Sequence, residues 1–279
     1  MNIWRFHISR RTLTVAAALV GVVSLAIGAH AALNKRALDA AKAISTEHDA
    51  SSVKRISRLA LVIGNGHYPD ANAPLTQPIN DARALTASLR RNGFDVDVVE
   101  DASKDDMQRA IGRLKSKIKP DSVVMLFFGG YGVQAGRESY MIPVDAAIWK
   151  ESDVRRDGIS IESVLETMKE QGARAKLVVV DASRRNPYER RFRTFSHGLA
   201  PINAPDNALI LSSATPGKVA DDSQGPYSVL MAELLGNLTA QAGAETAFNK
   251  TRVAISRASD GEQVPSVSSS LVEDVRFGG

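Results

Sequence analysis

Short apolar runs alternate with amphipathic helical segments from residue 58 onward, and this alternation restricts the possible folds more than any other feature of the chain. The run Val123–Phe128 is typical, because it has the length and side chains of a strand buried on both faces. Strands that alternate with helices of this length predict a mostly parallel sheet covered by helices on both faces. We therefore expect an α/β fold, a helix–sheet–helix sandwich with about six strands.

The apolar periodicity predicts where the individual elements lie. In the helix within 78–94, Asn80 or Asp81 is available as the N-terminal cap and Gly93 ends the helix. Ser103 is the expected N-cap of the next helix. The predicted strands are 59–64, 95–100, 123–128, 176–183, 208–214 and 270–277, and the predicted helices are 78–94, 103–119, 160–172, 226–238 and 243–259.

Composition excludes several classes of function. The chain of 279 residues contains no cysteine, which excludes disulfides, cysteine-ligated zinc and a thiol nucleophile. Residues 1–57 carry eight Lys and Arg against three Asp and Glu, whereas residues 58–279 carry 27 against 28, a net charge of −1. The main part of the chain therefore has no net attraction for a polyanion, and we predict no nucleic-acid partner.

The N-terminal segment has the pattern of an export signal. Arg5, Arg10 and Arg11 precede an uncharged stretch from Thr12 to Asn34, which predicts a signal peptide or an uncleaved membrane anchor over residues 1–33. Residues 34–57 are interpreted as a linker. The body of the protein is therefore predicted to be periplasmic, secreted or anchored in the inner membrane, with membrane contact through the N-terminal segment only.

Three of the predicted strands end in chemically distinctive loops: GNGHYPD (64–70), GGYG (129–132) and DASRRNP (181–187). Sites in parallel sheets form outside the carboxyl ends of the strands, so these loops are the candidate site. The glycines of the first loop have neither the spacing of a dinucleotide-binding loop nor the Gly-Lys-Ser/Thr of a nucleotide-triphosphate loop. We predict no cofactor and no metal.

Several blocks of sequence resemble the bacterial caspase-like peptidases, the metacaspase or orthocaspase group. The blocks occur in order over 58–279, which we interpret as one caspase-like domain. They are RLALVIGNGHY, NDARALTASLRRNGFDV, VVMLFFGGYGVQ, SYMIPVDA, KLVVVDASRRNP, GLAPINAPDNALILSSATPG, GPYSVLMAELL and QVPSVSSSL.

The resemblance assigns roles to four positions. In that family the strand matching 122–128 ends in Ser-Gly-His-Gly, with the histidine as general base, and the strand matching 176–181 ends in Asp-Ala-Cys-Arg, with the cysteine as nucleophile. Here Tyr131 stands at the histidine position and Ser183 at the cysteine position, fifty-two residues apart, close to the spacing of about fifty in caspases. The resemblance also implies that the Gly132 N–H stabilises an oxyanion and that Asp181 lines a pocket for Arg or Lys.

The two substitutions remove the chemistry that the family uses. A tyrosine with a pKa near about 10 stays protonated at neutral pH, and a serine needs a base during attack. We therefore predict a pseudo-peptidase that binds a peptide or protein ligand in a regulatory or scaffold role. The alternative is an active hydrolase with Ser183 as nucleophile, which would need His67 or His197, the two histidines of 58–279, as its base.

Overall fold

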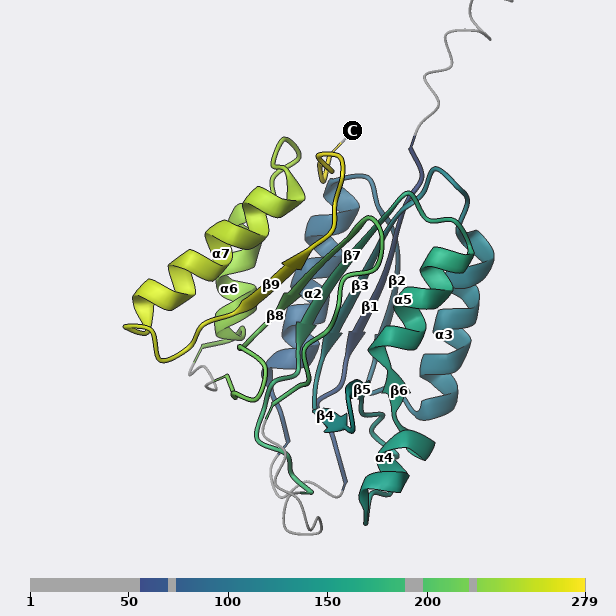
Figure 1. Cartoon of the computed structure of the whole chain (residues 1–279), viewed down its shortest axis with the longest axis vertical. Helices are drawn as coiled ribbons and strands as arrows, with labels where there is room; N and C mark the ends of the chain where they lie inside the picture. Colours follow the sequence, from purple (N-terminus) through teal and green to yellow (C-terminus); the bar gives the residue numbers. More distant parts are fainter. Residues whose placement is uncertain (1–55, 70–73, 189–197, 221–224, 279) are drawn as a thin grey trace, which may run out of the picture. The chain divides into compact units, whose positions relative to one another are not determined.

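A six-stranded sheet lies at the centre of the fold (Figure 1). The computed structural model describes residues 56–69, 74–188, 198–220 and 225–278, which belong to one compact unit, Ile56–Gly279. The strand order is β2-β1-β3-β7-β8-β9, and β9 alone in this sheet is antiparallel to its neighbour. The strands are β1 (Arg58–Gly64), β2 (Asp95–Glu100), β3 (Val123–Gly129), β7 (Ala175–Asp181), β8 (Ala208–Ser212) and β9 (Ser266–Ser269).

Helices cover both faces of this sheet. In Figure 1, α3 and α5 lie on one side, and α2, α6 and α7 lie on the other. The prediction of an α/β fold with a mostly parallel six-stranded sheet is therefore confirmed. The helices are α2 (Gln77–Arg91), α3 (Lys104–Lys117), α4 (Glu151–Asp157), α5 (Ile161–Glu170), α6 (Val229–Asn237) and α7 (Ala244–Ala258).

The central strands are apolar throughout because they contribute to two cores. Phe127 packs in the core shared with α2, α6 and α7, whereas its neighbour Phe128 packs in the core shared with α3 and α5. Successive side chains of a strand point to opposite faces. A strand buried on both faces consequently cannot show an alternating apolar and polar pattern.

Local signals placed the start of α3 correctly but not the start of α2. Ser103 is the N-cap of α3, and its hydroxyl accepts a hydrogen bond from the Asp106 N–H at 3.2 Å. Asp106 reaches back to the Ser103 N–H, which completes a capping box. The predicted cap at Asn80 or Asp81 is wrong, because α2 begins three residues before Asn80 and its N-cap is Thr76.

The strand predicted at 270–277 is also wrong. The last strand is β9, Ser266–Ser269, which pairs with β8. The apolar residues of 270–277 suggested a strand, but Val272 is 84% exposed. The pairing of an edge strand depends on its register with the neighbouring strand, and a short serine-rich segment gives little apolar signal.

A small antiparallel sheet and a short helix were not predicted. The sheet consists of β4 (Gly132–Ala135), β5 (Glu138–Met141) and β6 (Ile159–Ser160), and α4 lies between the last two of these strands in the chain. These strands have two to four residues, too few for a periodic pattern to be recognised.

Within the described ranges, no helix is long and apolar enough to cross a membrane. The predicted signal or anchor at 1–33 and most of the predicted linker lie outside those ranges.

Candidate functional site

The loops that follow β3 and β7 run side by side at the carboxyl edge of the central sheet. Gly129 in β3 is the register partner of Asp181 in β7, so the two strands end level. Beyond the strands, backbone hydrogen bonds of 3.2 and 3.0 Å continue to join the two segments. The structure therefore brings the segments that hold Tyr131 and Ser183 together, although these residues are far apart in the sequence.

Gly132 is needed for this close approach of the two loops. A Cβ atom at this position would lie 2.9 Å from the Ala182 carbonyl oxygen and 2.6 Å from a Leu199 methyl carbon. The resemblance implies that the Gly132 N–H stabilises an oxyanion. Here this N–H donates to the Ala182 carbonyl at 3.0 Å. In this structure the amide is thus engaged by the chain itself, and an oxyanion would have to replace that bond.

Tyr131 is packed against a second tyrosine. Its ring meets the Tyr68 ring edge to face, with the centroids 4.8 Å apart, and both residues are buried. The Tyr68 hydroxyl accepts from the Tyr131 N–H at 3.0 Å and donates to the Ile142 carbonyl at 3.0 Å. Burial raises the pKa of Tyr68 above its ordinary value, so its phenol remains a donor. The residue to which the resemblance assigns the histidine position is thus part of an aromatic contact.

Ser183 is buried among other hydroxyls at the end of β8. Its Oγ lies 3.5 Å from the Ser212 Oγ, and its N–H donates to the Ser213 Oγ at 3.4 Å. Only 1% of Ser183 is exposed. Sequence reasoning missed Ser212 and Ser213 as members of the site. Their place at the carboxyl end of a predicted strand was the signal that could have identified them.

Asp181 lies in a buried charge cluster with Arg184. The Arg184 Nη2 is 3.6 Å from the Asp181 Oδ2, and both residues are buried. The Arg184 Nη1 donates to two carbonyls at the strand ends, to Gly130 at 3.1 Å and to Asp181 at 2.5 Å. Asp181 Oδ2 has no hydrogen-bond partner among the described residues. A buried carboxylate oxygen without a donor is unusual, because burial of an unpaired charge is costly.

A second buried carboxylate, Asp81 of α2, interacts electrostatically with both Asp181 and Arg184, and we include it in the cluster. It is fully buried and accepts from the Ser228 N–H, at the N-cap of α6, at 3.1 Å. Burial, followed by the negative charge of Asp181, raises the pKa of Asp81 to about 7. Asp81 was missed as a site residue because it was interpreted as one of two candidate helix caps. It stands four residues before Leu85, a position that places it on the buried face of the helix.

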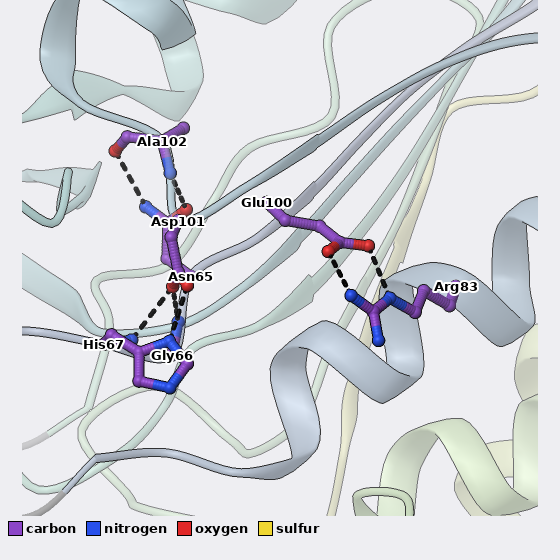
Figure 2. A network of polar contacts seen from close by, with 7 residues as sticks. All are labelled: Asn65, Gly66, His67, Arg83, Glu100, Asp101 and Ala102. Atoms are coloured by element: carbon purple, nitrogen blue, oxygen red, sulfur yellow. Dashed lines mark hydrogen bonds and ion pairs between the residues drawn. The ribbon is translucent and has the colours of Figure 1, made fainter.

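His67 forms a separate polar network with Asp101, at the ends of β1 and β2 (Figure 2). The His67 Nδ1 is 2.5 Å from the Asp101 Oδ2, and the N–H groups of Gly66 and His67 donate to the Asp101 Oδ1 at 2.8 and 2.9 Å. The His67–Asp101 pair follows β1 and β2, whereas Ser183 follows β7. Strand β3 lies between β1 and β7, so the pair and Ser183 are at the ends of strands that are not neighbours in the sheet. His67 is thus held by Asp101, while His197 lies outside the described residues.

The His67–Asp101 pair is expected to contribute a modest, pH-dependent stabilisation. Partial burial acts to raise the pKa of Asp101, but hydrogen bonds from His67 and Gly66 outweigh it and lower the pKa below its ordinary value. The stabilisation is therefore present at neutral pH and is lost as the pH falls through the folded-state pKa of Asp101. We expect Asp101→Asn to lower the free energy of unfolding by about 1 kcal/mol at pH 7 and to have little effect below pH ~3.

Urea denaturation at pH 7 and at pH 3 measures this difference. Asparagine is the matched substitution because Asp101 has a φ of 47°, in the left-handed region that Asn tolerates. Asp101→Ala should cost more than Asp101→Asn at both pH values, since it adds backbone strain. An equal loss for Asp101→Asn at pH 7 and pH 3 would show that the charge of Asp101 contributes nothing.

The fold and this strand-end site define a caspase-like α/β domain, and comparison with known sequences agrees. The chain belongs to the caspase-domain family of peptidases, C14, whose family model matches residues 57–276. Two relatives are mucosa-associated lymphoid tissue lymphoma translocation protein 1 of Homo sapiens and its homologue of Mus musculus. Each is 27% identical over 133 residues, which is 47% of this chain and 16% of the relative's length.

The match to these relatives therefore covers less than a fifth of their length. In the part of the chain that the structure describes, no group of three or more His, Asp or Glu side chains is arranged to hold a metal ion.

Proposed function

We propose that this chain is an exported caspase-like pseudo-peptidase, which binds a peptide segment or partner protein at the ends of β3 and β7 without hydrolysing it. The observation that carries the proposal is the contact of the Ser183 hydroxyl, which lies 3.5 Å from another serine hydroxyl. A hydroxyl does not take up a proton at neutral pH, so this neighbour cannot activate Ser183. Tyr131, at the position of the family's histidine, packs on Tyr68 instead.

The charges of the cluster support a basic ligand. Two carboxylates, Asp81 and Asp181, lie with one guanidinium, that of Arg184, in a region from which water is largely excluded. The negative charge of Asp181 opposes the ionisation of Asp81, and a further cation would relieve this repulsion. The ligand is therefore a segment with an accessible Arg or Lys, which also agrees with the role that the family resemblance gives to Asp181.

Export rests on the N-terminal sequence. The arginines before the uncharged stretch Thr12–Asn34 support delivery to the membrane or beyond it. An exported domain that binds without cutting fits a regulatory or scaffold role.

The ligand class is tested by binding of fluorescent peptides that differ only in a central Arg, Lys or Asp. The full-length chain should bind the Arg and Lys peptides at least about tenfold more tightly than the Asp peptide, without producing fragments. Asp181→Asn, once shown to be folded by circular dichroism, should lose this preference. Asp105→Asn is the control, since it removes the charge of an exposed Asp on α3.

Two results would contradict the proposal. Cleavage of the peptides by the native chain, together with fluorophosphonate labelling of Ser183, would instead identify a serine hydrolase. Basic peptides would be excluded as the ligand class if neither the native chain nor a variant of Arg184 bound the Arg and Lys peptides more tightly than the Asp peptide.

A further inference from the structure

We propose that Arg184 is an internal ligand of the acidic cluster, so that the native chain is autoinhibited and a basic ligand must displace this side chain in order to bind. The inference rests on the proposed function, because it assumes that the cluster is where a basic side chain binds. It concerns the regulation of that site by a residue of the chain itself.

The position of Arg184 is the first support. Its guanidinium is held at the ends of the two central strands, where Nη1 donates to the Gly130 and Asp181 carbonyls at 3.1 and 2.5 Å. Only 7% of Arg184 is exposed. The side chain thus fills the space beside the Asp181 carboxylate that the guanidinium of a ligand would need.

The geometry of the ion pair is the second support. Arginine and a carboxylate pair most strongly through hydrogen bonds of about 2.7–2.9 Å, often two in parallel. Here the Nη2–Oδ2 separation is 3.6 Å, and the Asp181 Oδ2 accepts no hydrogen bond among the described residues. Arg184 therefore offsets the charge of Asp181 without donating a hydrogen bond to its Oδ2. A ligand with an unconstrained guanidinium can make the paired hydrogen bonds that Arg184 does not make.

The balance of charge is the third support. Asp81 and Asp181 repel each other across the cluster, and Arg184 is the cation that acts on Asp81. Removal of Arg184 takes away the charge that pairs with Asp181 and that lowers the pKa of Asp81, which is costly until another cation enters. Arg184 and the cation of a ligand therefore compete for the cluster, because the same carboxylates attract both.

The first test uses a small guanidinium as the probe. Arg184→Ala creates the space for methylguanidinium, and we expect millimolar methylguanidinium to raise the Tm of this variant by a few degrees. The native chain should not respond, because Arg184 already occupies the space. Tetramethylammonium, which has no hydrogen-bond donor, controls for ionic strength. The double variant Arg184→Ala/Asp181→Asn should lose the response.

The second test measures the affinity for the Arg peptide. Arg184→Gln retains an N–H donor for the strand-end carbonyls but removes the charge, so it preserves the backbone contacts better than Ala does. It should bind the Arg peptide at least about tenfold more tightly than the native chain. Arg185→Ala is the matched control, because it removes an exposed arginine next in the chain, and it should bind as the native chain does.

The outcomes separate the two proposals. If the native chain and Arg184→Gln both prefer the Arg peptide and bind it with equal affinity, autoinhibition is overturned while the proposed function stands. Absence of charge-selective binding in both would overturn the proposed function and, with it, this inference. If Arg184→Ala folds only when methylguanidinium is added, that dependence supports the inference. Failure of methylguanidinium to stabilise this variant, or an equal effect of tetramethylammonium, would contradict it.

Discussion

The double variant Tyr131→His/Ser183→Cys is expected to cleave peptides after Arg or Lys, whereas the native chain leaves them intact. Loss of a single member of a comparable catalytic set costs about 10⁴-fold to 10⁶-fold in turnover, so restoring both members should raise the rate by at least ~10⁴-fold. An imidazole beside the introduced thiol favours the reactive thiolate. The measurement is the rate of fragment formation by mass spectrometry.

The structure favours tolerance of both substitutions. The contact of position 131 with the Tyr68 hydroxyl is made by the backbone N–H, which a histidine retains. Position 183 is a small side chain near the Ser212 hydroxyl, and a thiol differs from it by one atom. Because Arg184 is expected to restrict binding, the double variant should also be assayed with Arg184→Gln added.

Two controls identify the source of any activity. Tyr131→His/Ser183→Ala has the imidazole without a nucleophile and should be inactive. The native chain has no cysteine, so iodoacetamide reports on the introduced thiol alone, and its rate against pH gives the thiolate fraction. Inactivity of the double variant in both Arg184 backgrounds would indicate that the engaged Gly132 amide cannot be released to an oxyanion. Cleavage by the native chain that is abolished by Ser183→Ala would refute the pseudo-peptidase assignment.

Replacement of Asp81 by Asn is expected to remove a large pH dependence of stability. In the unfolded chain an Asp loses its proton near pH ~3.9, whereas burial and the charge of Asp181 raise the pKa of Asp81 in the folded chain to about 7. Between these values the folded state binds more protons. Stability therefore falls as the pH rises from about 4 to about 7, and the contribution of Asp81 is constant outside this window.

The size of the effect follows from the shift in pKa. One pKa unit corresponds to about 1.4 kcal/mol, so a shift of this size implies a loss of roughly 2–4 kcal/mol between pH 4 and pH 8. Asp81→Asn should abolish this loss, so that the variant is more stable than the native chain at pH 8. Its amide oxygen can still accept from the Ser228 N–H.

Denaturation in urea at a series of pH values tests this expectation. Urea is preferred to guanidinium chloride, because the salt would screen the charge interactions of the cluster. Asp105→Asn, on the exposed face of α3, should leave the native pH dependence unchanged. If the Asp81→Asn variant retains the slope of the native chain, Asp81 is ionised in the folded state and Arg184 compensates its charge.

Some positions in the fold and site were predictable from local patterns. The apolar run of β3 and its terminal glycines placed Tyr131 at a strand end, and the same logic placed Ser183 after β7. The prediction failed where a residue's role depends on a distant partner. Asp81 was interpreted as one of two candidate caps of its own helix, yet its carboxylate accepts from the Ser228 N–H, 147 residues later in the chain.

The sequence by itself determined the α/β architecture, the strand ends that form the candidate site, and the absence of a thiol nucleophile, because periodicity and composition can be recognised without knowledge of distant contacts. Only the tertiary structure decided that Asp81, Asp181 and Arg184 share one buried cluster, and that His67 pairs with Asp101 rather than Ser183. The physical reason is that strand order and register set which distant side chains meet, and a charge changes its pKa and its partners according to those neighbours.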